Sequence, residues 1–243
     1  MKTINFLGYP LCTDLKQIDF NGAPVIINTL NPHSYCIAKK DELFDNALKA
    51  SDVLVPDGIG IVWGEKTINK NAIGKIAGFD VFIHIMNMLN TSGGTAFFLG
   101  ASQDTLKKIK EKAKVDFPMA EVCSYSPPFR DKFSQEDCRV MCEVVNMKKP
   151  DVLFVGMTAP KQEKWVYENK QQLNAKIICS IGAVFDFYAG NVERPSQFWI
   201  SMGLEWLPRL LKEPKRLFYR NFVSTPKFIL EVLCFKFFNK GIL

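Results

Sequence analysis

Short apolar runs alternate along the chain with longer stretches of helical spacing. Six runs bounded by turn-forming residues predict buried strands, over residues 24–29, 52–55, 95–99, 121–124, 151–155 and 176–181. The apolar spacing between them predicts helices over residues 34–50, 79–89, 103–115, 135–147 and 160–173. This alternation predicts an α/β fold, with a Rossmann-like, mainly parallel sheet flanked by helices.

Ligands of such sheets bind beyond the carboxyl ends of the strands, so the residues after each strand are the ones that matter for function. In this chain they are small or polar, over residues 28–31, 56–60, 100–102, 156–160 and 182–186. A binding site is therefore expected along this edge of the sheet.

The composition is that of an ordinary globular protein, with 47% hydrophobic and 23% charged residues among 243. This length allows one large domain or two small lobes, with a weak boundary over residues 90–94. Seven cysteines without framework spacing indicate reduced thiols in a cytoplasmic protein. No signal peptide is visible, and no apolar stretch reaches the roughly 20 residues that span a bilayer.

The charge is concentrated at the C-terminus. Residues 204–243 carry eight Lys or Arg against three Glu, a net charge of +5 out of +6 for the whole chain, and eight of the thirty aromatic residues. We therefore expect a body over residues 1–203 and a basic, aromatic helical appendage over residues 204–243. Such an appendage suits a membrane surface that carries phosphorylated lipid. Nucleic acid ranks lower as a partner, because the segment contains no recognisable nucleic-acid module.

Asp57 follows a predicted strand and precedes two glycines. From the residues alone, a turn aspartate that caps the next helix is the more common explanation, and a general base at a strand end is the alternative. The spacing of Gly58, Gly60 and Asp80 partly resembles a dinucleotide fingerprint, but Trp63 stands where its third glycine should be. An oxidoreductase that uses a nucleotide cofactor is therefore a weaker hypothesis.

A second candidate site begins at Gly156, which ends a strand shortly before Pro160. A helix N-terminus there, with Lys161 and Gln162 as donors, suits a diphosphate, although an ordinary strand–helix junction would also fit. Asp186 is an acid among apolar neighbours, for which a structural role and ligand contact are about equally supported.

Metal and cofactor chemistry have little support in the residue types. The chain has two histidines and no Asp-x-Asp, so a metal site is not expected, nor is a cofactor. The charge of a bound diphosphate would then be met by Lys, Arg and backbone N–H groups. Arg209, Arg216 and Arg220 would share one helical face if their helix were continuous, whereas Pro208 and Pro214 argue for breaks.

In combination and order, these motifs resemble the WecG/TagA/CpsF glycosyltransferases over residues 28–220. The motifs that carry the resemblance are Asn28-Thr-Leu-Asn31, Pro56-Asp-Gly-Ile-Gly60, Ala77-Gly-Phe-Asp80, Thr95-Ala-Phe-Phe-Leu-Gly100, Ala159-Pro-Lys-Gln-Glu163, Phe185-Asp-Phe-Tyr-Ala-Gly190, and Gly203-Leu-Glu-Trp206 with Arg209, Glu213-Pro214 and Arg216.

The resemblance implies an inverting, metal-independent transferase at the inner face of the bacterial plasma membrane. Its members move a sugar, typically N-acetylmannosamine or its uronic acid, from UDP to a lipid-diphosphate-linked GlcNAc during synthesis of surface polysaccharide or teichoic acid. By motif position Asp57 corresponds to the proposed base and Thr29 to the active-site threonine. The residues expected to bind substrate are Asn31, Lys75, Gly156, Lys161, Gln162, Asp186, Arg209, Arg216 and Arg220.

The chain differs from the family pattern at Lys75, where the family usually has arginine. Lysine keeps the positive charge but cannot form the two parallel hydrogen bonds of a guanidinium group. The donor sugar, the acceptor glycan and any self-association stay open. Besides the oxidoreductase, a third hypothesis is a non-catalytic adaptor at the membrane surface, for which the aromatic tail alone would suffice.

Overall fold

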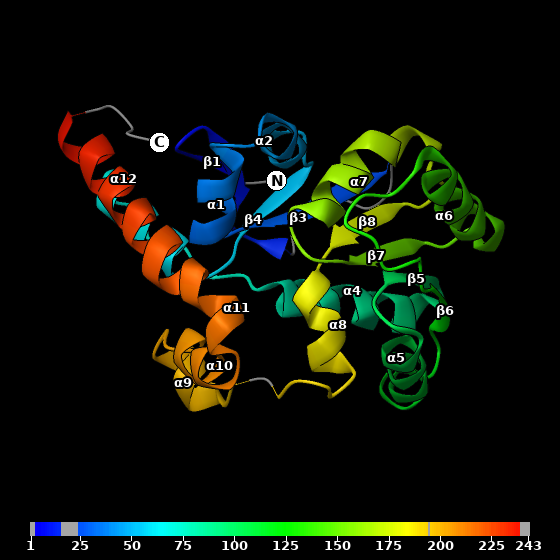
Figure 1. The fold of residues 1–243 in the computed structure, drawn as a ribbon. Coiled ribbons are helices and arrows are strands. Elements are labelled where there is room, and N and C mark those ends of the chain that lie inside the picture. Colours follow the sequence, from blue (N-terminus) through cyan, green and yellow to red (C-terminus); the bar gives the residue numbers. More distant parts are fainter. Residues whose placement is uncertain (1–2, 16–23, 194, 239–243) are drawn as a thin grey trace.

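A single eight-stranded sheet runs through the computed structural model, which describes residues 3–15, 24–193 and 195–238 (Figure 1). The order of the strands is β1-β2-β4-β3-β8-β7-β5-β6, and all neighbours are parallel except β1 and β2. The strands are β1 Thr3–Phe6, β2 Tyr9–Cys12, β3 Val25–Leu30, β4 Val53–Pro56, β5 Thr95–Gly100, β6 Glu121–Tyr125, β7 Val152–Gly156 and β8 Ile177–Ser180.

All six predicted strands are confirmed to within one residue at each end, together with the mainly parallel α/β sheet. The hairpin of β1 and β2 was not predicted. Its two-residue turn, Leu7 and Gly8, has φ of 49° and 88°. Positive φ at both residues gives the turn a twist that matches the right-handed twist of the two antiparallel strands. A leucine in this conformation is uncommon, which is why the sequence pattern did not indicate the turn.

The helices are α1 Pro32–Ala38, α2 Glu42–Lys49, α3 Ile59–Ile68, α4 Gly78–Ser92, α5 Gln103–Asp116, α6 Gln135–Lys148, α7 Lys161–Asn169, α8 Gly182–Tyr188, α9 Gln197–Ser201, α10 Trp206–Lys212, α11 Pro214–Tyr219 and α12 Thr225–Phe238. A short 3₁₀ helix, Lys170–Gln172, follows α7, and a π-helical turn, Arg220–Ser224, joins α11 to α12.

The prediction of one helix over residues 34–50 is wrong. The chain forms α1 and α2 there, and the side chain of Asp41 accepts a hydrogen bond from the N–H of Phe44 to cap the second helix. Helices α3 and α8 were not predicted, because each begins directly in the small and polar residues that follow a strand.

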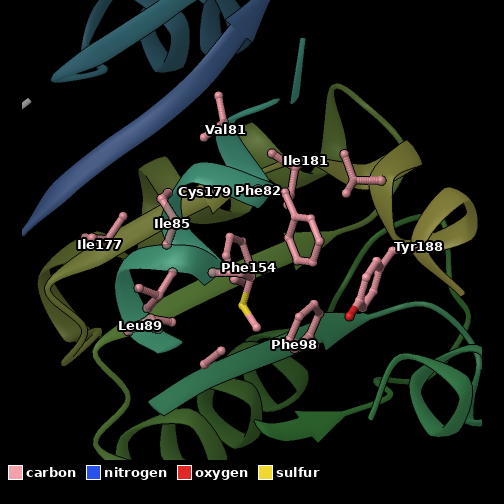
Figure 2. Close-up of a cluster of buried hydrophobic side chains, with 14 of the residues drawn as sticks. Val81, Phe82, Ile85, Leu89, Phe98, Phe154, Ile177, Cys179, Ile181 and Tyr188 are labelled. Atoms are coloured by element: carbon pink, nitrogen blue, oxygen red, sulfur yellow. The ribbon is translucent and has the colours of Figure 1, made fainter. Parts of the chain in front are cut away.

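Helices cover both faces of the sheet. On one face α4, α5 and α8 bury an aromatic cluster around Phe82, whose ring lies 5.4 Å from that of Phe154 and 4.7 Å from that of Tyr188 (Figure 2). On the other face α6 and α7 pack on the sheet through buried side chains that include Met141 and Trp165. Both faces are apolar, as expected for a parallel sheet.

Helix α12 runs back along α1 and α3 (Figure 1). Its Phe228 and Val232 are fully buried in a third apolar cluster, and the Phe228 ring lies 5.4 Å from that of Tyr35 on α1. The Tyr35 hydroxyl donates to a carboxylate oxygen of the buried Glu231 at 3.1 Å. One face of the basic C-terminal segment is thus part of the core, while its division from the body at residues 203 and 204 stays a prediction.

Of the helices in the described part of the chain, none is both long enough and apolar enough to cross a membrane. All seven cysteines are free thiols, and four of them are buried.

Candidate active site

The carboxyl ends of β3 and β4 bring Thr29 and Asp57 to neighbouring positions. Thr29 pairs with Val55 in the register of these strands, and the N–H of Asp57 donates to the carbonyl oxygen of Leu30 at 2.8 Å. Asn31 comes next and caps α1, its side-chain oxygen accepting from the N–H groups of His33 and Ser34. This oxygen therefore has a structural role, and the binding role expected for Asn31 stays a prediction.

Asp57 is partly buried, and the N-cap residue of the helix that follows it is Gly58. The side chain of Asp57 is therefore not the N-cap of α3, so the explanation that the residues alone favoured is wrong. Burial raises the pKa of the Asp57 carboxyl above its ordinary value. Among neighbouring charges, Arg220 lowers this pKa most, Glu205 raises it, and Lys75 and Arg209 lower it further.

The C-terminal segment thus supplies three of the four charges that act most strongly on Asp57. The Lys75 amine pairs with a carboxylate oxygen of Glu205 at 2.8 Å, an ion pair that ties the segment to the body. The guanidinium of Arg209 lies over the ring of Phe187, 5.0 Å from its centroid. Helix α10 ends before Pro214, so the arginines reach the site from separate elements and not from one continuous helix. The side chain of Arg216 lies outside the described part of the structure.

Gln162 joins the ends of β7 and β8. Its side-chain oxygen accepts from the N–H groups of Met157 and Gly182, both at 3.1 Å, and its amide group donates to Glu163 at 2.9 Å. The residue is buried, so these contacts make it a rigid junction beneath the expected diphosphate site. Burial raises the pKa of Glu163 to about 7, and one of its oxygens has no hydrogen-bond partner among the described residues.

Two further candidates have other contacts. The Lys161 amine donates to the carbonyl oxygen of Arg130 and lies 3.7 Å from the centroid of the Phe133 ring, so it turns toward the segment before α6. Asp186 accepts a hydrogen bond from the Asn191 side chain at 3.3 Å. Neither residue is among the charges that act on Asp57, and their roles in binding stay predictions.

The glycines of the dinucleotide-like motif have structural explanations. A Cβ on Gly60 would lie 2.5 Å from the ring of Pro32, so this glycine allows α3 to approach α1. The Asp80 carboxylate accepts from the N–H of Ala77 and caps its own helix. These contacts give Gly60 and Asp80 structural roles.

Three residues of this region were not recognised as important from the sequence. Glu205 is the partner of Lys75, Glu163 supports Gln162, and His33 contacts the C-terminal segment. Glu205 and Glu163 stand inside the motifs that carry the family resemblance, which is a signal for them. The sequence pattern contained no signal for His33, because its partner Ser224 lies 191 residues away in the sequence.

A shielded carboxylate at the carboxyl edge of an α/β sheet, with basic residues of a distant segment close to it, is typical of an enzyme active site. The chain belongs to the glycosyl transferase WecG/TagA/CpsF family, whose model matches residues 11–241. It is therefore a glycosyltransferase.

Among its relatives is an N-acetylglucosaminyldiphosphoundecaprenol N-acetyl-beta-D-mannosaminyltransferase of Bacillus spizizenii, 31% identical over 90% of this chain and 82% of the relative. A protein of the same name from Bacillus subtilis is 30% identical over 86% of this chain and 78% of the relative. One from Staphylococcus aureus is 22% identical over 79% of this chain and 74% of the relative.

The close packing of the strand ends predicts that Gly156→Ala destabilises the protein. A Cβ there would lie 2.4 Å from the buried ring of Phe185, and such overpacking costs about 1–3 kcal/mol. Gly74→Ala is the matched control, because no atom lies within 4 Å of a Cβ at that position. Denaturant unfolding followed by circular dichroism measures both variants, and equal stability of the two would contradict the packing argument.

Proposed function

We propose that this glycosyltransferase moves N-acetylmannosamine, or a closely related sugar, from UDP to an undecaprenyl-diphosphate-linked GlcNAc, with inversion and without a metal ion. The observation that carries the proposal is the environment of Asp57. Its carboxylate is shielded at the end of a strand, and three charged residues of the C-terminal segment act on it. The names of the relatives support the choice of donor sugar and acceptor.

In the proposed reaction Asp57 removes the proton from the acceptor hydroxyl of GlcNAc. The acceptor oxygen attacks the anomeric carbon from the face opposite UDP, and the new C–O bond forms as the bond to the diphosphate breaks. The electron pair leaves with UDP, and Asp57 later returns its proton to water. A raised pKa suits this role, because a base is most effective when its pKa lies closer to the working pH.

The negative charge of the leaving diphosphate is met by protein groups in this proposal. Lys75, Arg209 and Arg220 all lie close enough to act on Asp57, and a diphosphate beside Asp57 would be within their reach. The first turns of α7 and α8 add backbone N–H groups other than those of Met157 and Gly182, which already donate to Gln162. Thr29 lies beside Asp57 and is proposed to position the acceptor.

We further propose that the C-terminal segment rests on the inner face of the plasma membrane, where a polyprenyl-linked acceptor resides. Of seventeen exposed large apolar side chains among the described residues, nine lie within residues 204–238. Those of Phe218 and Phe222 are more than half exposed, and their rings lie 5.0 Å apart. Such side chains among basic residues favour an anionic bilayer.

Asp57→Asn tests the assignment of the base. With GlcNAc-diphosphate-lipid and a panel of UDP-sugars, release of UDP should fall about 10²–10⁴-fold in this variant, while UDP binding and the unfolding temperature stay unchanged. Wild-type turnover should persist in EDTA, with UDP-N-acetylmannosamine as the best donor.

Four results would count against the proposal. Near-normal turnover of Asp57→Asn removes this residue from the role of base. Loss of turnover in EDTA that a divalent ion restores removes metal independence. Lipid binding without transfer from any donor favours the adaptor, and binding of NAD without binding of UDP favours the oxidoreductase.

The charges around Asp57 predict how activity depends on pH. The base acts in its ionised form, so kcat/KM should fall as the pH drops through the raised pKa of Asp57, above the ordinary range of an aspartate. Arg220→Gln removes a charge that lowers this pKa, so the acidic limb of the plot of kcat/KM against pH should move to higher pH. Glu205→Gln removes a charge that raises it, so the limb should move to lower pH.

Glu193→Gln is the control for these shifts. Glu193 pairs with Lys212 on the surface and is not among the charges that act on Asp57, so its loss should leave the limb in place. Shifts of the same sign in Arg220→Gln and Glu205→Gln would contradict the assignment of the limb to Asp57.

Alanine variants of three phenylalanines distinguish side chains that contact the membrane from side chains that pack in the core. Phe222→Ala should weaken binding to anionic vesicles with little loss of stability, because the side chain is 55% exposed. Phe228→Ala should cost about 3–5 kcal/mol of stability, because its ring is fully buried. Phe129→Ala, at a fully exposed ring outside the C-terminal segment, should change neither property.

Vesicle flotation at low and high salt measures the binding, and denaturant unfolding measures the stability. Anionic vesicles should bind the protein more tightly than neutral ones, and high salt should reduce the difference in binding between the two. Equal flotation of Phe222→Ala and the wild type would remove this ring from the membrane contact.

A further inference from the structure

The helical run at the C-terminus is interrupted by a π-helical turn, Arg220–Ser224, between α11 and α12. The backbone N–H of Thr225 donates to the carbonyl oxygen of Arg220, and the Thr225 hydroxyl donates to the same oxygen at 3.0 Å. A π turn contains an extra residue, so it rotates the side chains before it by about 100° relative to those after it. The direction in which Arg220 points is therefore set at this turn.

The π turn is held by α1. Ser224, its last residue, is 2% exposed, and its hydroxyl lies 2.8 Å from Nδ1 of His33. The Cys36 thiol donates to the carbonyl oxygen of Ser224 at 3.3 Å. His33 and Cys36 are three residues apart and share one face of α1. The ring of Tyr219, just before the π turn, makes an edge contact with the His33 ring at 6.2 Å between centroids.

The same helix begins at the active-site edge. Its cap residue Asn31 directly follows Leu30, whose carbonyl oxygen accepts the N–H of Asp57. A short and rigid path of hydrogen bonds and backbone therefore connects Asp57, through the start of α1 and His33, to the π turn that bears Arg220. In agreement with this path, burial lowers the pKa of His33 and the positive charge of Arg220 lowers it further, while Arg220 is the strongest of the charges on Asp57.

We propose that His33 is a positioning residue, which holds the π turn through Ser224 so that Arg220 faces the site at Asp57. This inference rests on the proposed function, in which Asp57 is the base and Arg220 meets the diphosphate. His33 itself need not touch the substrate. Its hydrogen bond adds a directional contact to the apolar packing that holds α12 against α1.

The experiment compares His33→Ala, Ser224→Ala and the double variant in the transfer assay. Each single variant should lower kcat/KM for the lipid-linked acceptor roughly threefold to tenfold, the range expected for one hydrogen bond. The double variant should lose no more than the larger single loss, since both remove the same bond. The acidic limb should move to higher pH in all three, as in Arg220→Gln, because Arg220 no longer faces Asp57.

Two matched variants complete the set. His33→Asn keeps a polar atom near the place of Nδ1 and should restore most of the activity. His84→Ala removes the other histidine, which lies on α4, and should leave both the rate and the limb unchanged. Should His33→Ala fail to fold, Ser224→Ala and His33→Asn carry the same comparison.

Arg220→Gln separates failure of this inference from failure of the proposed function. Normal transfer by Arg220→Gln would overturn the role of Arg220 in the proposed function, whatever His33 does. Impaired transfer by Arg220→Gln, together with full activity of His33→Ala and Ser224→Ala, would overturn the inference alone. Additive losses in the double variant with an unmoved limb would also overturn it, because they indicate a merely structural role.

Discussion

Burying a carboxylate at the end of a strand costs free energy unless nearby positive charges or hydrogen bonds stabilise its ionised form. Asp57 sets this constraint for the whole molecule. Its position beyond β4 is determined by the sheet, whereas most of the positive charge that acts on it comes from Arg220 and Arg209, more than 150 residues later in the chain. The C-terminal segment must therefore fold back over this edge for the site to exist.

The fold meets this requirement with apolar packing and a few polar contacts. Phe228 and Val232 bury one face of α12 against α1 and α3, which contributes most of the stabilisation, since burial of large apolar side chains is worth more than exposed ion pairs. The directional contacts are Lys75 with Glu205, Tyr35 with Glu231, and His33 with Ser224. They determine how the segment is oriented, while its other face keeps exposed aromatic rings.

The opposite half of the active-site edge is organised by close backbone approach. Gly156 and Gly182 admit neighbours that a Cβ would exclude. The side-chain oxygen of Gln162 bridges the two strand ends, while its amide nitrogen donates to Glu163. In the proposed function these close contacts would favour the preorganised binding of a diphosphate. The two halves thus differ physically, one being held by packed backbone and the other by a segment returning from far along the chain.

The sequence by itself determined six of the eight strands, the parallel sheet and the edge where the site lies, because buried parallel strands and the small residues after them leave a local pattern. It also indicated Asp57 and the basic tail. Only the tertiary structure decided that α1 and α2 are separate, that Asn31 and Gln162 have structural partners, and that Lys161 turns toward Phe133. It alone brought Glu205, His33 and the π turn to the site. The helix break and the cap at Asn31 depend on local bonds between side chains and backbone, which apolar periodicity does not register. Glu205, His33 and the π turn depend on contacts between residues far apart in sequence, which leave no periodicity in the chain.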